Sequence, residues 1–140
     1  MMKDYVDLIA RISIAFIFLY EAYDSIVFFH KTKETMTAYG ITWNQDLLLI
    51  GVIFCLILGS LLILIGYYAS VGGFLILLYW IPFTFIVFSF WNDPIELRRE
   101  SSLQFMRNMG TAAALMLLMA NGAGKFSVKR IIHTLRLPEE

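Results

Sequence analysis

The chain has 140 residues, of which 59% are hydrophobic, and its mean hydropathy is +0.72. Soluble domains of this size are less apolar, and a membrane bundle plus a separate globular domain would need a longer chain. The 11 basic and 11 acidic residues cancel, so no net charge attracts the chain to nucleic acid, and we expect no nucleic-acid partner. The composition predicts one membrane domain over residues 1–140, of the all-α class.

The N-terminal part predicts a first membrane-spanning helix over residues 8–29. Arg11 lies near its start, and Glu21 and Asp24 lie well inside it. The apolar residues favour insertion by about 5 kcal/mol, whereas two central carboxylates oppose it by roughly 5 to 7 kcal/mol. We therefore expect groups on other helices to satisfy both acids, the alternative being that the carboxyls are protonated, which desolvation favours. For Arg11 we expect contact with lipid phosphates, the alternative being a polar contact near Asn121.

The stretch from Leu47 to Trp91 contains no Asp, Glu, Lys or Arg. One continuous helix of this length would measure about 68 Å, more than twice the ~30 Å hydrocarbon core of a bilayer. The stretch therefore predicts two spans, residues 46–66 and 74–91, joined by a turn whose three glycines loosen the helix. Within the second span, the small residues at positions 51, 55 and 59 predict a ridge for close helix packing. Cys55 is interpreted as a packing residue.

A fourth span is predicted over residues 103–121, which makes the fold a four-transmembrane-helix bundle. A basic tail, residues 122–140, follows it, and its cations alternate with apolar residues, a pattern suited to anionic headgroups. Four spans place both termini on one side of the membrane. That side carries slightly more basic residues, which favours the cytoplasm for both termini.

The chain carries several short motifs: Arg11, Phe18 and Ser25 on the first span, Tyr39-Gly40-Ile41, Asn92 at the end of the third span, Phe105-x-Arg107-Asn108, and Gly122-x-Gly124-Lys125-Phe126-Ser127. Together these motifs resemble the DoxX-like family of small four-helix integral membrane proteins. The resemblance implies a multi-pass protein of the bacterial cytoplasmic (inner) membrane. It also implies a subunit of a quinone-linked oxidoreductase complex, such as a thiosulfate:quinone oxidoreductase.

The chain departs from the family pattern at two places. Glu21-Ala22 and Ser25 stand where relatives carry His-Gly and Lys, and no histidine precedes the Phe90-Trp91 pair. Roles assigned to those family residues therefore do not transfer to this chain.

The candidate site is a cluster of ionisable residues within the membrane. Glu21 and Asp24 share one helix face, and we expect Arg107 with Asn108 to pair with them if the first and fourth spans are antiparallel neighbours. The two acids are the candidate catalytic residues, for proton exchange. The candidate ligand-binding residues around them are Tyr20, Tyr23, Trp80, Trp91, Arg107 and Asn108. The alternative is that this cluster only fixes helix register.

We expect no intrinsic cofactor and no metal site, with a quinone as the candidate exchangeable ligand. Partner redox or membrane subunits would then deliver the electrons. A homo-oligomer is a further candidate assembly. The alternative function is a non-catalytic structural or assembly component of a larger membrane complex. A small carrier is the third candidate, although four spans without an internal repeat rarely make one.

Overall fold

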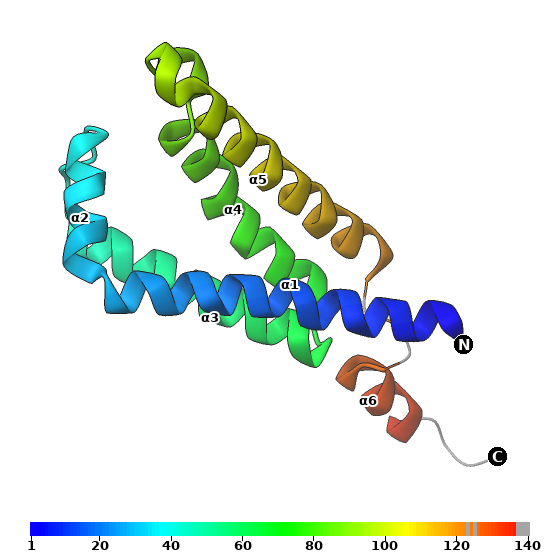
Figure 1. The fold of residues 1–140 in the computed structure, drawn as a ribbon. Helices are drawn as coiled ribbons and strands as arrows, with labels where there is room; N and C mark the ends of the chain where they lie inside the picture. The colour runs from blue at the N-terminus through cyan, green and yellow to red at the C-terminus, as the bar shows by residue number, and fades with distance from the viewer. Residues whose placement is uncertain (123, 125, 137–140) are drawn as a thin grey trace.

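The computed structural model describes residues 1–122, 124 and 126–136, and its regular structure in this part of the chain is entirely helical (Figure 1). The α-helical class predicted from composition is therefore confirmed. The helices are α1 (Met2–Val27), α2 (Phe29–Ala38), α3 (Gln45–Ile65), α4 (Ala69–Val87), the short 3₁₀ helix η1 (Phe90–Asn92), α5 (Ile95–Asn121) and α6 (Val128–Arg136).

The four long helices form an open V. α1 packs on α3, α3 packs on α4 and α4 packs on α5, so α1 and α5 are the two outer members of the row. The arms α1–α3 and α4–α5 meet at the end that carries the N-terminus and α6, and they diverge toward α2 (Figure 1). Among the described residues, α1 and α5 do not pack closely enough to close a bundle.

The core lies where the arms meet. Each long helix contributes a fully buried apolar side chain, namely Phe18, Leu56, Ile76 and Leu115. Phe18 also meets Trp80 edge to face, with ring centroids 5.0 Å apart. Because lipid is as apolar as these side chains, van der Waals packing holds the helices together here, rather than exclusion from water.

Glycines bring α3 and α4 into backbone contact. A Cβ atom on Gly59 would lie 2.7 Å from the carbonyl oxygen of Gly72, and one on Gly73 would lie 2.7 Å from Cγ of Met119 on α5.

The turn between α3 and α4 is shorter than predicted. It comprises residues 66–68, in which Gly66 and Tyr68 have positive φ, and Gly72 and Gly73 belong to α4. These two glycines are explained by helix crossing, not by turn formation.

Two helical segments, Gln45–Ile65 and Ala69–Asn92, are long and apolar enough to cross a membrane. They correspond to the predicted second and third spans. The first span qualifies only as a broken pair, because α1 bends by 91° into α2. The predicted span 103–121 lies within α5, which carries charges in its first two turns and at Arg107, and α5 does not meet the same criterion. The predicted number of four crossings is thus not confirmed.

Candidate functional site

A polar centre lies at the narrow end of the V, around Arg11. This side chain is fully buried, and its Nε lies 3.3 Å from Oδ2 of Asp7 one helical turn earlier. Nη1 donates a hydrogen bond to the carbonyl oxygen of Ile63 at 3.5 Å, and Nη2 donates one to the carbonyl oxygen of Phe126. The expected contact of Arg11 with lipid phosphates is therefore wrong, because acceptors from α3 and from the segment after α5 surround the guanidinium.

The segment after α5 is held by the same polar centre. The backbone N–H of Gly124 donates to Oδ2 of Asp7 at 3.1 Å, and Ser127 Oγ donates to the carbonyl oxygen of Gly124 at 2.7 Å. Glycine is required here because a Cβ on residue 124 would lie 3.0 Å from Cγ of Asp7. This packing gives a physical reason for the Gly-x-Gly-x-x-Ser motif. Since Arg11 is sealed from solvent, its guanidinium joins α1, α3 and this segment and is not available to a ligand.

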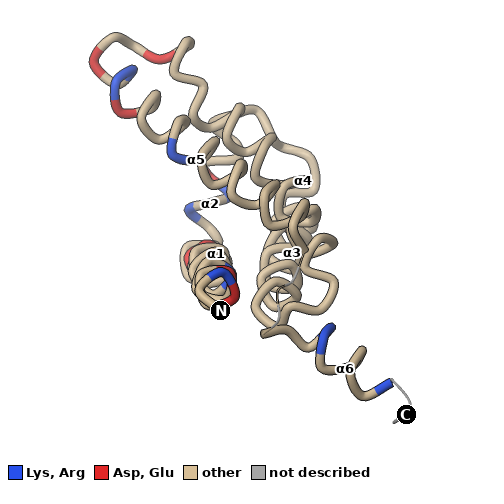
Figure 2. The backbone as a smooth tube through the Cα atoms, turned by 90° about the vertical axis from the view of Figure 1, so that its right-hand side faces the viewer, with Lys and Arg blue, Asp and Glu red and all other residues tan. Residues whose placement is uncertain are grey.

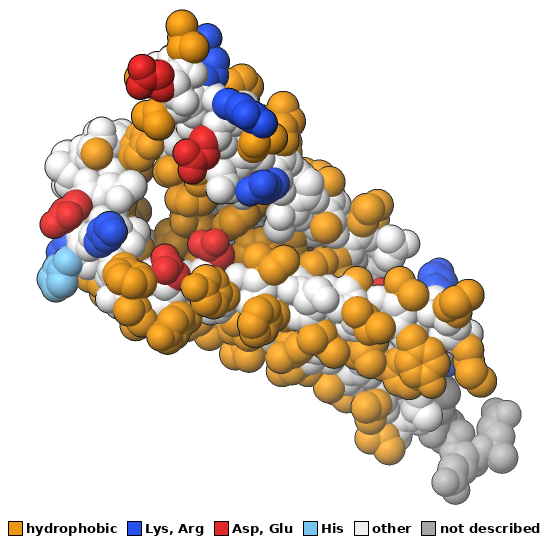
Figure 3. Space-filling view, in the orientation of Figure 1, with side chains coloured by type: hydrophobic (Ala, Val, Ile, Leu, Met, Phe, Trp, Pro, Cys, Tyr) orange, Lys and Arg blue, Asp and Glu red, His pale blue; other side chains and the backbone are white. Residues whose placement is uncertain are grey.

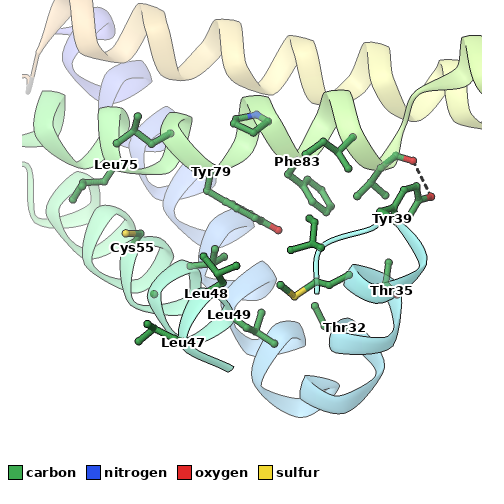
Figure 4. Close-up of a pocket in the computed structure, with 18 residues that line it drawn as sticks. Thr32, Thr35, Tyr39, Leu47, Leu48, Leu49, Cys55, Leu75, Tyr79 and Phe83 are labelled. Atoms are coloured by element: carbon green, nitrogen blue, oxygen red, sulfur yellow. Dashed lines mark hydrogen bonds between the residues drawn. The ribbon is translucent and has the colours of Figure 1, made fainter. Parts of the chain in front are cut away.

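An apolar concave site lies at the other end of the molecule, between α2, α3 and α4. It is a groove of about 550 Å³, which lies within the range of small-molecule sites. We call it the apolar groove. Figure 4 shows its lining, which includes Thr32, Thr35, Met36, Tyr39, Leu47, Leu48, Gly51, Cys55, Leu75, Leu78, Tyr79, Pro82, Phe83 and Val87. The small residues Gly51 and Cys55 leave space on the α3 wall, where a larger side chain would fill the groove.

Two phenol groups give the apolar groove its polarity. Tyr79 extends from α4 into the groove, and Tyr39 closes its edge by donating a hydrogen bond to the carbonyl oxygen of Val87 at 3.1 Å (Figure 4). The groove can thus offer a hydroxyl donor to a ligand that is otherwise held by apolar contacts.

The aromatic residues predicted to bind a ligand do not form the expected pocket. Trp80 is buried, and its Nε1 donates to the carbonyl oxygen of Asn108 at 3.0 Å, so these two predicted residues do meet. Tyr20, Tyr23 and Trp91 are about half exposed, with 59%, 61% and 49% of their surfaces accessible. None of these predicted aromatic residues lines the apolar groove.

The predicted pairing of Arg107 with the two acids is not present. Glu21 is half-buried, Asp24 and Arg107 are exposed, and no ion pair within the described part of the chain joins Arg107 to either acid. The expectation assumed that the first and fourth helices are neighbours, whereas α1 and α5 are the outer members of the V. Figure 3 shows acidic side chains of α1 and basic side chains of α5 on opposite walls of the hollow between the arms.

Sequence reasoning missed the apolar groove and the true surroundings of Arg11. The Asp7–Arg11 spacing of four residues was a usable signal for the ion pair, since such residues share a helix face. The apolar groove had no comparable signal, because it depends on the bend between α1 and α2. Within the described residues, no group of three or more His, Cys, Asp or Glu side chains comes together that could hold a metal ion.

The fold and the exposed apolar surfaces of α3 and α4 define the class: a multi-pass α-helical membrane protein whose outer faces are compatible with lipid contact. A family model, DoxX, matches residues 6–89, more than half of the chain, and the protein belongs to this family. The matched region includes Arg11 and the whole apolar groove, whereas Arg107 and the Gly122–Ser127 segment lie beyond it. No curated protein and no solved structure matches the chain.

Proposed function

We propose that this protein is a membrane subunit of a quinone-linked oxidoreductase complex and that the apolar groove takes the quinone. The observation that carries the proposal is the position of the Tyr79 hydroxyl in a mostly apolar groove of about 550 Å³. A quinone has a flat ring with carbonyl acceptors and an apolar tail. The tyrosine hydroxyl can donate to a quinone carbonyl while the aliphatic and aromatic walls hold the ring.

Glu21 is the proposed proton-exchanging group. Reduction of a quinone to the quinol consumes two electrons and two protons. Glu21 is half-buried on α1, a position suited to proton exchange, and the exposed Asp24, three residues further along α1, can recharge it from the hollow. The electrons are assigned to a partner subunit.

The proposed location is the bacterial cytoplasmic (inner) membrane, with both termini in the cytoplasm. The N-terminus and α6 lie at the same end of the V, which is compatible with this orientation (Figure 1).

Binding of a short-chain, fully substituted benzoquinone to the purified full chain in lipid nanodiscs tests the proposal. We expect Cys55→Trp to abolish binding because the indole fills the apolar groove, and Tyr79→Phe to weaken it by about fivefold through loss of one hydrogen bond. Tyr20→Phe is the matched control, since Tyr20 lies outside the groove, and it should bind as the unmodified protein does. Unchanged binding by Cys55→Trp would contradict the proposal.

A non-catalytic assembly role is the second candidate, and one observation favours it. The first turns of α5 carry exposed charges of both signs beyond the packed part of the molecule (Figure 2): Glu96, Arg98, Arg99 and Glu100. Such a surface suits a polar protein partner. If this role is correct, reversing these charges releases a copurifying subunit, whereas Cys55→Trp leaves the complex and its turnover intact.

A further inference from the structure

A second cavity, of about 1130 Å³, lies at the narrow end of the V, far from the apolar groove. We call it the basic cavity. The start of α1, the turn between α3 and α4, and α6 form its walls, and its lining includes Lys3, Tyr67, Tyr68, Lys129, Arg130 and Arg136. α6 and the N-terminus lie at the same end of the molecule in Figure 1, and basic residues are marked on both α6 and α1 in Figure 2.

The charge balance of the basic cavity is positive. Its four cations are Lys3, Lys129, Arg130 and Arg136, and no ion pair in the described part of the chain engages any of them. Two acids also line the cavity, and both have partners. Asp7 faces Arg11 and the N–H of Gly124, and Asp4 lies 3.5 Å from the terminal amine of Met1. The walls therefore favour an anion.

The basic cavity lies at one end of the two helices that are apolar enough to cross a bilayer. The turn that contributes Tyr67 and Tyr68 joins the two helices that are apolar enough to cross it, and such tyrosine rings commonly lie at the headgroup level. α6 is amphipathic: Lys129, His133 and Arg136 follow one face at helical spacing, and Ile131 and Leu135 follow the other. Ile131 and Leu135 are exposed, so nothing in the described chain covers them.

We propose that the basic cavity binds the phosphate of an anionic phospholipid, with the apolar face of α6 lying in the adjoining acyl region. Lys and Arg side chains bind phosphate through charge-assisted hydrogen bonds, and a basic amphipathic helix lies at the membrane interface with its apolar side in the lipid. The exposed apolar side chains beside the cations favour a lipid over a free phosphate ion, which would use only the charged wall.

Native mass spectrometry of the full chain in detergent, titrated with phosphatidylglycerol or phosphatidylcholine, tests this site. We expect retention of phosphatidylglycerol and little retention of phosphatidylcholine. The triple variant Lys129→Gln, Arg130→Gln, Arg136→Gln should bind phosphatidylglycerol about 100-fold more weakly, at about fivefold for each cation lost near a membrane surface. All three side chains are exposed, so the fold should persist.

The matched control is the triple variant Lys31→Gln, Arg98→Gln, Arg99→Gln, which removes three cations outside the basic cavity. It should bind phosphatidylglycerol as the unmodified chain does. Equal losses in both triple variants would show a general effect of net charge and overturn the site. Displacement of the lipid by millimolar inorganic phosphate would show a free-anion site and overturn the lipid assignment. The result is independent of quinone binding, because the apolar groove lies at the other end of the molecule.

Discussion

The fully buried guanidinium of Arg11 and the partly exposed carboxylate of Asp7 form an ion pair at the narrow end of the V, with Arg11 Nε 3.3 Å from Asp7 Oδ2. Each partner also reaches a segment distant in sequence: Arg11 donates to the carbonyl oxygens of Ile63 and Phe126, and Asp7 accepts from the N–H of Gly124. One charge pair on α1 thus holds the end of α3 and the segment that leads into α6.

Replacing Arg11 should destabilise the protein strongly. Arg11→Ala leaves the Asp7 carboxylate without its cation and two carbonyl oxygens without their donor. Breaking a fully buried pair from one side costs about 3 to 5 kcal/mol, and the partial exposure of Asp7 places the expected loss at the lower end of this range. The measurement is the free energy of unfolding in mixed micelles of mild detergent and dodecyl sulfate. The exposed Arg98→Ala is the control and should change stability by less than about 0.5 kcal/mol. Equal effects of the two changes would contradict a closed polar centre.

Gly66→Ala should displace Arg11 from its partners. Residue 66 has φ of +77°, which is unfavourable for alanine, and its added Cβ would meet Ser127 Cβ at 2.6 Å and the Arg11 guanidinium. We expect a lower thermal midpoint and faster proteolysis after α5. Gly110→Ala on α5 is the control, since its Cβ has open space, and it should be neutral or slightly stabilising. If both variants melt alike, the close packing around Gly66 is not as described.

The two glycines on α3 should respond differently to alanine. Gly59→Ala places a methyl group 2.7 Å from a backbone oxygen of α4 and so forces the helices apart, whereas the Cβ of Gly51→Ala meets nothing within 4 Å. We expect only Gly59→Ala to reduce thermal stability, measured for both variants in the same detergent. A comparable loss in Gly51→Ala would indicate that another helix packs against that part of α3.

Exchanging the charges of Asp24 and Arg107 should produce no rescue. Both side chains are exposed, and α1 and α5 are the outer helices of the V, so neither charge depends on the other. We expect the double variant Asp24→Arg, Arg107→Asp to equal the sum of the single variants within about 0.5 kcal/mol. A double variant that is clearly more stable than this sum would show that the two residues do pair.

The sequence predicts where each helix lies along the chain better than it predicts which helices pack against each other. The uncharged stretch from Leu47 to Trp91 indicates two helices because no other backbone conformation satisfies its polar groups in lipid, and both form close to the expected positions. Gly72 and Gly73 were less informative, because glycine serves turns and helix crossings equally well. Only the packing of α3 on α4 distinguishes these two uses.

The candidate site was harder to predict, because it depends on the angles between helices. The 91° bend between α1 and α2 brings Tyr39 to Val87 and so forms one side of the apolar groove, and no residue pattern marks this bend. The pairing of Asp24 with Arg107 relied on matching depths in two helices assumed to be adjacent. The depth of a residue in the membrane follows from its position in the sequence, but which helices are neighbours is set by helix packing.

Photolabelling with an azidoquinone, followed by peptide mapping, tests the central proposal most directly. The account predicts that the label attaches to the lining of the apolar groove, on peptides that contain Tyr39, Cys55 or Tyr79, and that excess unlabelled quinone prevents it. A label confined to Tyr20 and Tyr23 on α1, or no label that unlabelled quinone can displace, would contradict a quinone site between α2, α3 and α4.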